Sequence, residues 1–421
     1  MPTLALLVLA LSISAIFYHI GRTPDLKTYV PEFIALALGA GVLYVIGVYL
    51  VERFEFGRVA LAVILGSALA IRLVVLPASL SISTDAFRYQ WEGRVQRAGI
   101  NPYATNPTAL HHAFEDPEHP LETGAATPTL YPPLSEFSFA WVKTIPDYKR
   151  LYTGLDVASI VVLLLLLAIR KQPLQRVLAY AWNPTVVISF ALCGHHDALA
   201  ILTLLGANLF IINQRWALSI LFLALSALSK FFAVLLVPVF LQRTRWIYAG
   251  LFAVVVILAY VPYASVGWKL LDGLSQYSAG WENNDSLFRL LLLAGNSKPQ
   301  AGLVAGILIA GLMAFVLKKR MEPLRASLFL VAGLLLLSPN AFPWYFTWTI
   351  PFVCFYPSAP WLLMSVTCVL GYAPLVAYSA GLAYQDSPLV LWLEYAPVLA
   401  WLGYQAVAET RHSKIQTGNR T

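Results

Sequence analysis

The sequence predicts an all-α polytopic membrane protein, and two observations support this prediction. Hydrophobic residues make up 59% of the 421-residue chain and charged residues only 12%, about half the charged share of an ordinary soluble protein. Many apolar residues also lie in runs of about 20, the length that a helix needs to cross a bilayer. This composition excludes a disordered chain and a disulfide scaffold, and the scattered basic residues do not support nucleic-acid binding.

Twelve apolar segments are the predicted membrane spans. They occupy residues 3–20, 30–51, 59–80, 151–169, 174–191, 197–213, 246–263, 301–317, 325–338, 344–357, 359–379 and 389–408. Several contain a proline, which buried membrane helices tolerate because neighbouring groups satisfy the freed backbone atoms. The first segment lacks a basic start and a small-residue cleavage site, so we expect a span rather than a signal peptide. We therefore expect one membrane domain over residues 1–410 and a basic cytoplasmic tail over residues 411–421.

The distribution of charge predicts how the spans are oriented. Loops rich in Lys and Arg stay in the cytoplasm, and such clusters occur at residues 170–176, 243–245 and 318–325 and in the tail. The long segment 81–147 holds only four basic residues but eight acidic ones, namely Asp85, Glu92, Glu115, Asp116, Glu118, Glu122, Glu136 and Asp147. We therefore expect this loop to be extracytoplasmic and both termini to be cytoplasmic.

The apolar run 216–241 lies between basic residues, so both of its ends are expected in the cytoplasm. Trp216 and Lys230 are about 14 residues apart, or about 21 Å of helix, which is too short for a full crossing. We therefore expect two short helices that meet at Ser229 and Lys230, which gives about 12–14 hydrophobic segments in all. A lysine inside a membrane run is usually functional, although Lys230 could instead reach toward lipid head groups. Arg72, inside the third span, has the same two interpretations.

An amphipathic helix is expected at the start of the long loop, from a cap at Ser83 and Thr84 to about Ala98. One face is charged and the other apolar, since the first carries Asp85, Arg88, Glu92 and Gln96 and the second carries Phe87, Trp91 and Val95. Such a helix is typical of a membrane surface, and we expect its charged side to face a wet cleft.

The charged residues of this helix have alternative interpretations. Asp85 could complement the helix dipole, or it could be a general base for an acceptor hydroxyl at the membrane–water boundary. Arg88 and Arg94 could bind a phosphate, or they could pair with Glu92 and with lipid head groups.

Two further polar segments lie at predicted membrane boundaries. In Gly194-His195-His196-Asp197, the aspartate could cap a helix, or the cluster could bind a polar ligand. Adjacent histidines point about 100° apart on a helix, so they form a poor metal site without a third ligand. The segment Trp281-Glu282-Asn283-Asn284-Asp285, followed by Arg289, has the composition of a sugar-contacting loop or of a capped helix start.

Taken in order, these motifs resemble the GT-C membrane glycosyltransferases, and among them glycosyltransferase family 87, which resembles polyprenyl-phosphate-mannose-dependent mannosyltransferases. The motifs extend from about residue 70 to 355 and are Ser83–Tyr89 with Trp91–Arg94, Gly99–Tyr103, Tyr131–Pro133, Trp182–Pro184, Gly194–Leu199, Ser229–Phe231, Ser286–Arg289, Ser338-Pro339 and Pro343–Tyr345. The chain departs from the relatives at His196, where they often have Asn, and at Phe342, where they often have His. It also lacks an Asp-x-Asp metal motif, because Ala86 and Phe87 follow Asp85.

The resemblance implies an inverting glycosyltransferase of the bacterial plasma membrane with an extracytoplasmic active site. It implies transfer of a hexose, expected to be mannose, from a polyprenyl-phosphate sugar in the membrane lipid to a glycan or glycolipid acceptor. Asp85 matches the catalytic base, and the donor phosphate is expected at Arg88, Arg94, Lys230 and Arg289. Sugar and acceptor contacts are expected at Glu92, Tyr131, His195, His196, Asp197, Trp281, Asn284, Trp344 and Tyr345. No cofactor is implied, and a divalent metal is not supported.

Other functions remain open at this point. A transporter or flippase of a lipid-linked saccharide would also have many spans and a basic residue in the membrane. It would usually show internal symmetry, which this chain lacks, and it would not need an ordered loop with one acid aimed at a cleft. An O-antigen-ligase-type enzyme would rely more on outer arginines and a histidine. A structural subunit would not need Lys230.

Overall fold

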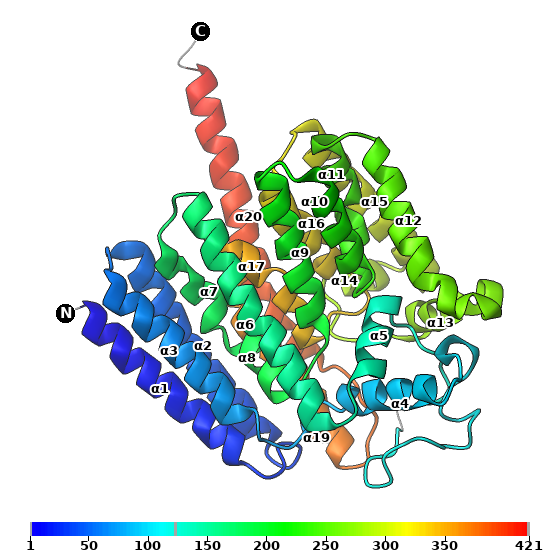
Figure 1. The fold of residues 1–421 in the computed structure, drawn as a ribbon. Helices are drawn as coiled ribbons and strands as arrows, with labels where there is room; N and C mark the ends of the chain where they lie inside the picture. Colours follow the sequence, from blue (N-terminus) through cyan, green and yellow to red (C-terminus); the bar gives the residue numbers. More distant parts are fainter. Residues whose placement is uncertain (1, 122–123, 419–421) are drawn as a thin grey trace.

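The computed structural model describes residues 2–121 and 124–418, so Glu122 and Arg420 lie outside the described residues. These described parts form helices joined by turns and loops, with no β-strand among them. Seven of their helices are long and apolar enough to cross a membrane, and a bent pair of helices gives an eighth candidate. The long helices run side by side in one bundle (Figure 1). The prediction of an all-α polytopic membrane protein is confirmed.

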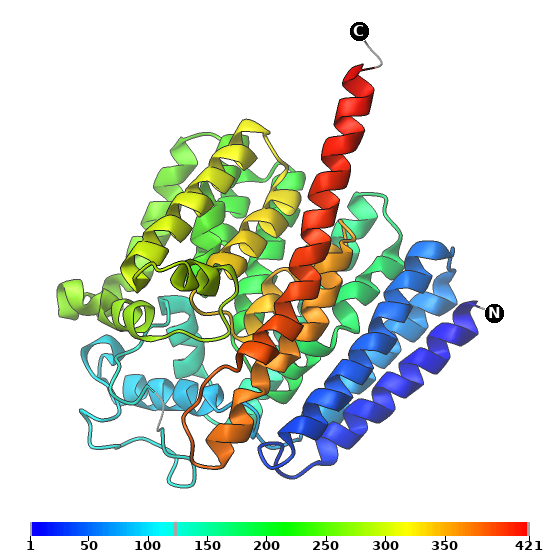
Figure 2. The same cartoon turned by 180° about the vertical axis from the view of Figure 1, so that it is seen from behind.

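Three long helices form one side of the bundle (Figure 2). They are α1 (Pro2–Arg22), α2 (Val30–Arg53) and α3 (Arg58–Val75). Helix α1 buries Leu6, Ile13 and Phe17, which lie along one face, whereas Leu4 and Leu11 are more than 60% exposed. A helix that is apolar all round is typical of a membrane span, because its outer face meets lipid rather than water.

The long loop follows α3 and lies across one end of the bundle (Figure 1). Its helices are α4 (Asp85–Arg97), η1 (Pro102–Ala104) and α5 (Pro133–Trp141), and α6 (Ile145–Ile169) comes next. The predicted helix after Thr84 is therefore present. The Thr84 side chain makes no capping hydrogen bond, because its φ of −107° and ψ of 5° depart from the extended geometry that a cap requires.

Helix α4 is more deeply buried than the sequence pattern predicted. Trp91 is 1% exposed on the apolar face, and Glu92 is 0% exposed on the charged face. Gly93 allows this burial, because a Cβ atom there would lie 2.1 Å from the Phe139 carbonyl oxygen of α5. Only the first turn of α4, with Asp85 and Arg88, faces a cavity, so most of the charged face lies inside the protein rather than in a wet cleft.

The predicted span at residues 174–191 is not a single helix. It consists of η2 (Leu174–Val177), α7 (Leu178–Ala181), α8 (Pro184–Val187) and the π-helix η3 (Ile188–Leu192). Asn183 and Pro184 start a new helix, since the Asn183 side chain accepts a hydrogen bond from the Val186 amide. The chain then bends by 119° into α9 (Asp197–Ile212). Gly194 permits this turn with a φ of 68°, and His195 and His196 lie in the bend.

Two short helices occupy the run 216–241, as predicted. They are α10 (Trp216–Ala227) and α11 (Val237–Arg243), and the 3₁₀ helix η4 (Phe231–Leu236) precedes α11. Lys230 lies at the corner between α10 and η4 in an extended conformation, with a φ of −153°.

The C-terminal part completes the bundle. Its elements are α12 (Ile247–Tyr260), η5 (Val261–Leu271), α13 (Asp272–Gly280), α14 (Leu287–Leu293), α15 (Lys298–Lys318), α16 (Pro323–Leu337), η6 (Pro343–Trp348), α17 (Ile350–Val353), α18 (Ala359–Thr367), η7 (Cys368–Tyr372), α19 (Pro374–Ser379) and α20 (Pro388–Gly418). The predicted span 344–357 is divided at Thr349, between η6 and α17, and Pro351 lies in the first turn of α17, where its missing amide hydrogen is tolerated. Helix α20 continues past residue 408, so the predicted tail is helical as far as Gly418.

Arg72 has a structural partner inside the bundle. Its Nε donates to Oδ2 of Asp156 on α6 at 2.5 Å, and its Nη1 donates to the carbonyl oxygens of Ala68 and Ala181. Both charged side chains are 0% exposed. This pairing joins α3 to α6 and α7, so Arg72 has a role in packing and does not reach lipid head groups.

Candidate active site

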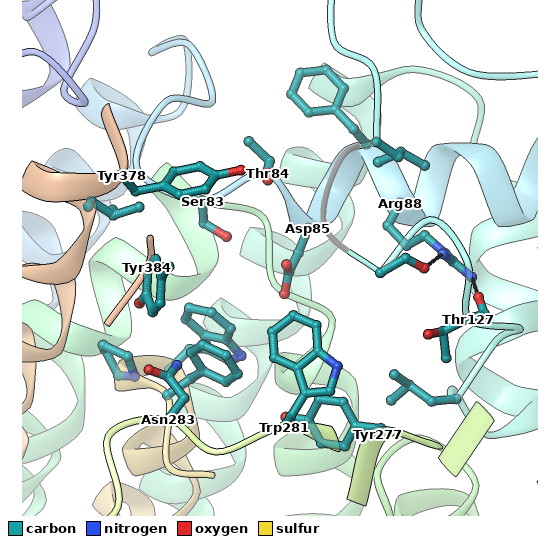
Figure 3. A pocket seen from close by; sticks show the side chains of 18 of the residues that line it. Ser83, Thr84, Asp85, Arg88, Thr127, Tyr277, Trp281, Asn283, Tyr378 and Tyr384 are labelled. Atoms are coloured by element: carbon teal, nitrogen blue, oxygen red, sulfur yellow. Dashed lines mark hydrogen bonds between the residues drawn. The ribbon is translucent and has the colours of Figure 1, made fainter. Parts of the chain in front are cut away.

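A cavity of about 780 Å³ lies where the loop helix α4, the α10–η4 corner and the C-terminal segments meet. Side chains from distant parts of the chain converge on it, as Figure 3 shows for Asp85 and Arg88 of α4, Tyr277 of α13 and Tyr384 of the loop before α20. Lys230 also lines this cavity. The cavity therefore brings the carboxylate of Asp85 and the ammonium of Lys230 into one space.

Asp85 is the first residue of α4, and its side chain is 37% exposed. Its Oδ2 atom lies 3.5 Å from Nδ1 of His195. Burial raises the pKa of the Asp85 carboxyl to about 6, with a further increase from Asp197, although the Lys230 ammonium opposes the shift. Because this pKa lies close to neutral pH, the carboxylate can accept a proton from a hydroxyl in the cavity.

Lys230 is held by a buried counter-ion and two aromatic rings. Its Nζ lies 3.3 Å from Oδ1 of Asp197, which is 0% exposed in the first turn of α9. Trp348 fixes the same carboxylate, since its Nε1 donates to Oδ1 at 2.7 Å. The ammonium also lies 5.0 Å from the Tyr345 ring centroid, within the range of a cation–π contact. The lysine side chain is 13% exposed, so its remaining donor capacity faces the cavity.

Arg88 lines the cavity, but its guanidinium is largely used within the protein. Nε donates to Glu92 at 2.8 Å, and the two terminal nitrogens donate to the carbonyl oxygens of Gly124 and Thr127. The guanidinium also lies 4.9 Å from the Trp91 ring centroid. Arg88 therefore connects α4 to the returning part of the long loop, and Glu92 serves as its buried partner.

The other two arginines predicted at the donor phosphate lie outside the cavity lining. Arg94 donates to the Phe114 carbonyl oxygen from the far part of α4. Arg289 forms ion pairs with Glu282 at 3.2 Å and with Asp285 at 3.0 Å. Of the four predicted phosphate ligands, the structure thus brings Arg88 and Lys230 to the cavity.

Aromatic side chains form much of the cavity wall. The predicted residues Tyr131, Trp281, Trp344 and Tyr345 all line it. Trp344 is stacked on Phe342 with ring centroids 4.6 Å apart, so Phe342 extends this aromatic wall. Flat aromatic surfaces beside polar groups suit the apolar faces of a sugar ring.

The two histidines and Asn284 lie behind the wall. His195 is stacked on Trp344 at 4.2 Å and faces Asp85. His196 is enclosed by rings that include Tyr89 and Tyr131, and neither of its ring nitrogens has a hydrogen-bond partner. The Asn284 amide donates to Glu394 and to the Ala341 carbonyl oxygen. Asp197 is also absent from the cavity lining, and it contacts Lys230, which does line the cavity.

Several cavity residues were not predicted from the sequence. They are chiefly Tyr277, Asn283, Tyr372, Tyr378 and Tyr384. Asn283 belongs to the polar segment that was recognised, but nothing in the sequence distinguishes it from Asn284. The tyrosines follow or interrupt apolar runs, where an aromatic residue at the membrane interface is the ordinary expectation.

The acidic, histidine and cysteine side chains that could bind a metal are not clustered in the described parts of the chain. Among residues 2–121 and 124–418, no group of three or more His, Cys, Asp or Glu side chains is arranged to hold a metal ion. Asp85 and His195 are neighbours, but a third ligand does not accompany them.

Comparison with known proteins gives one clear result. The family model described as the alpha-(1->6)-mannopyranosyltransferase N-terminal domain matches residues 25–245, which is more than half of the chain. This range contains Asp85, His195, Asp197 and Lys230. No curated protein matches the chain.

Proposed function

Because the chain belongs to the alpha-(1->6)-mannopyranosyltransferase family, we propose that it transfers mannose from a polyprenyl-phosphate sugar to a glycan or glycolipid acceptor. Membership of the family makes it a mannosyltransferase in general terms, and the long apolar helices place it in a membrane. The donor, the acceptor, the extracytoplasmic face of a bacterial plasma membrane and inversion of configuration are the proposed details.

One observation carries this proposal. A carboxylate from α4 and an ammonium from the α10–η4 corner, about 145 positions away in the sequence, line the same cavity. Transfer from a sugar phosphate needs a base for the attacking hydroxyl and positive charge for the departing phosphate. Asp85 supplies the first and Lys230 the second.

The proposed reaction is a single displacement. The acceptor hydroxyl oxygen forms a bond to C1 of the sugar while its proton passes to the Asp85 carboxylate. The bond between C1 and the phosphate oxygen breaks, and its electron pair leaves with the polyprenyl phosphate, next to the Lys230 ammonium. Attack from the opposite side of C1 inverts its configuration, so an α-linked product would require a β-linked donor.

Neighbouring residues position these two groups. His195 lies beside Asp85, and its ring is kept in place by stacking on Trp344. Asp197 and Trp348 hold the Lys230 side chain at the edge of the cavity. Because buried partners fix both groups, little reorganisation is needed when charge develops on the phosphate.

The proposal is tested with purified protein in detergent and a polyprenyl-phosphate mannose labelled in the sugar. We expect release of polyprenyl phosphate together with labelled mannoside when octyl α-mannoside is the acceptor. Guanosine diphosphate mannose serves as the alternative donor, and we expect no product from it. Transfer from the nucleotide sugar alone would contradict the proposed donor. Movement of a lipid-linked saccharide across vesicles without any transfer would favour a transporter instead.

A further inference from the structure

One end of the cavity lies away from Lys230. Figure 3 shows Tyr378, Tyr384 and Asn283 on one side of Asp85, and Arg88, Thr127 and Tyr277 on the other. Lys230 belongs to the Tyr277 side, because the Tyr277 hydroxyl bonds to that of Tyr345, whose ring lies next to the ammonium. We call the opposite end, formed by Asn283, Tyr372, Tyr378 and Tyr384, the tyrosine end.

Buried polar atoms at the tyrosine end lack hydrogen-bond partners. Asn283 is 4% exposed, and neither its Oδ1 nor its Nδ2 has a partner. The Tyr384 hydroxyl is a neighbour of this amide, but the geometry falls short of a hydrogen bond. Tyr372 is 3% exposed, and its hydroxyl also has no partner. An unsatisfied buried polar group is destabilising, so a ligand that supplies partners would be stabilised here.

The backbone holds Asn283 firmly at this position. Its amide donates to the Pro339 carbonyl oxygen at 2.9 Å, and its own carbonyl oxygen accepts from the Ala341 amide at 3.0 Å. These two bonds fix the backbone of Asn283 between its own segment and the segment that contains Pro339 and Ala341. Gly371 also lines the cavity, and a larger residue would be crowded there, because an added Cβ would lie 3.0 Å from Nδ2 of Asn284 and 3.1 Å from Cγ of Pro343.

The chemistry of this end suits a neutral sugar. An amide offers one acceptor and a pair of donors, which match neighbouring hydroxyl groups of a pyranose ring. Phenol rings provide both hydroxyl groups and flat apolar surfaces. Lys27 is the cation that lies on this side, since its carbonyl oxygen accepts from Ser379, next to Tyr378. An anionic ligand would depend on Lys27 rather than on Asn283.

We propose that the tyrosine end binds the acceptor sugar, with Asn283 and Tyr372 as hydrogen-bonding residues that select a hydroxyl-bearing ring. This inference rests on the proposed function, since it assigns the donor phosphate to the Lys230 end. The acceptor and the donor would then approach Asp85 from opposite sides. That arrangement directs the acceptor hydroxyl at the face of C1 opposite the phosphate, as displacement with inversion requires.

Binding is measured without any donor, by titrating octyl α-mannoside against intrinsic tryptophan fluorescence, because Trp281 and Trp344 line the cavity. We expect Asn283→Ala to weaken binding about 10-fold or more and Tyr372→Phe to weaken it about 3- to 10-fold. Tyr404→Phe is the matched control, since Tyr404 is 72% exposed on α20, and it should bind like the wild type. In transfer assays, both cavity variants should raise the KM for the mannoside and leave the KM for the donor unchanged.

Three results would overturn the inference. The first is the absence of mannoside binding by the wild-type protein, and the second is equal affinity in all four proteins. The third is displacement of the mannoside by inorganic phosphate that is lost in Lys27→Gln, because this would show an anion site. If Asn283-dependent binding occurs but no mannose is transferred, the sugar site stands and the proposed function fails.

Discussion

Asp85 differs from the other acidic residues of α4 and α5 in its surroundings. Glu92 is paired with Arg88, and Glu136 accepts hydrogen bonds from Thr129 and Gln96. Both of these glutamates are 0% exposed. Burial raises the pKa of Glu136 well above its usual range, and Glu92 adds to the effect. Their hydrogen bonds support the fold of the loop, whereas the Asp85 carboxylate reaches the cavity.

The first prediction concerns Asp85→Asn. Asparagine keeps the size of the side chain but removes the basic oxygen, so we expect the transfer rate to fall by at least about 100-fold. Folding should be retained, as judged by an unchanged elution volume in detergent. Glu118→Gln is the control, because Glu118 also lines the cavity but is exposed, and it should retain most of the activity. A rate within a few-fold of wild type for Asp85→Asn would exclude Asp85 as the base.

The second prediction is the pH dependence of kcat/KM. The active form of a general base is unprotonated, and burial raises the pKa of Asp85 to about 6. We therefore expect kcat/KM to rise about 10-fold per pH unit below pH 6 and to level off above it. The profile is measured between about pH 4.5 and 8 with saturating acceptor. A flat profile across pH 6 would mean that Asp85 does not control the reaction.

The third prediction distinguishes the role of Lys230 from the role of its counter-ion Asp197. Loss of a charged hydrogen bond to phosphate costs about 1.5–3 kcal/mol, so Lys230→Gln should raise the KM for the donor about 10- to 100-fold. Lys230→Arg should be milder but not neutral, because the guanidinium is larger and planar. Asp197→Asn should lower kcat by misplacing the ammonium, and Arg94→Gln serves as the control for general loss of positive charge. Donor curves that coincide for all these proteins would remove Lys230 from phosphate binding.

The sequence singled out Lys230 and Asp85 on different grounds. A lysine in an apolar run is costly, and such a cost usually reflects function. Asp85 could equally complement the helix dipole, and it became the candidate base only through the resemblance to membrane glycosyltransferases. The partners of these two residues could not be predicted, because contacts such as Lys230 with Asp197 and Trp348 depend on how three distant segments pack. For the same reason, nothing in the sequence showed that Arg94 and Arg289 would lie away from the cavity.

At the scale of the elements, one side chain joins the start of α4 to the returning part of the long loop. Arg88 connects α4 to two carbonyl groups of the returning chain, those of Gly124 and Thr127. Because Asp85 lies one helical turn before Arg88, the same contacts position the proposed base. The sequence predicted the α4 helix from its capping and periodicity, but it did not predict that Arg88 would hold the loop.

The fourth prediction follows from this contact. Lysine keeps the positive charge but cannot reach three partners at once, so Arg88→Lys should loosen the loop around residues 105–128. We expect faster cleavage by a protease specific for glutamate, because Glu115 and Glu118 lie in this loop. Arg94→Lys is the matched control, since Arg94 makes one contact to the loop, with the Phe114 carbonyl oxygen. Equal cleavage rates for the two variants would contradict a special role of Arg88.

Two other elements show which features of the fold the sequence could predict and which it could not. The short pair α10 and α11 was predicted, because the positions of Arg215 and Arg243 leave too few residues for two full crossings. The 119° bend before α9 was not predicted, although Asn183-Pro184 and Gly194 supply its local causes. Proline is common in membrane helices without such a bend, so the residues permit the bend but do not specify it.

On the scale of the whole molecule, the turns predicted as cytoplasmic come together at one end. Arg170 pairs with Glu322 at 2.6 Å, Arg176 pairs with Glu52 at 2.6 Å, and Arg243 donates to the Arg320 carbonyl oxygen. The long loop lies at the other end of the bundle (Figure 1). The basic turns and the acidic loop are thus separated by the length of the helices, as the charge pattern requires if they lie on opposite sides of a membrane.

The last prediction tests which side carries the cavity. Cys193, Cys354 and Cys368 are buried, so each is replaced by alanine, and single cysteines are introduced as Glu118→Cys in the loop and Lys319→Cys in the basic turn. Both positions are exposed, so both should react with a membrane-impermeant maleimide once cells are opened. In intact cells we expect labelling at position 118 only, because positively charged turns remain in the cytoplasm. Labelling at position 319 alone would place the cavity in the cytoplasm, where a nucleotide sugar is available, and would remove the reason to propose a polyprenyl-phosphate donor.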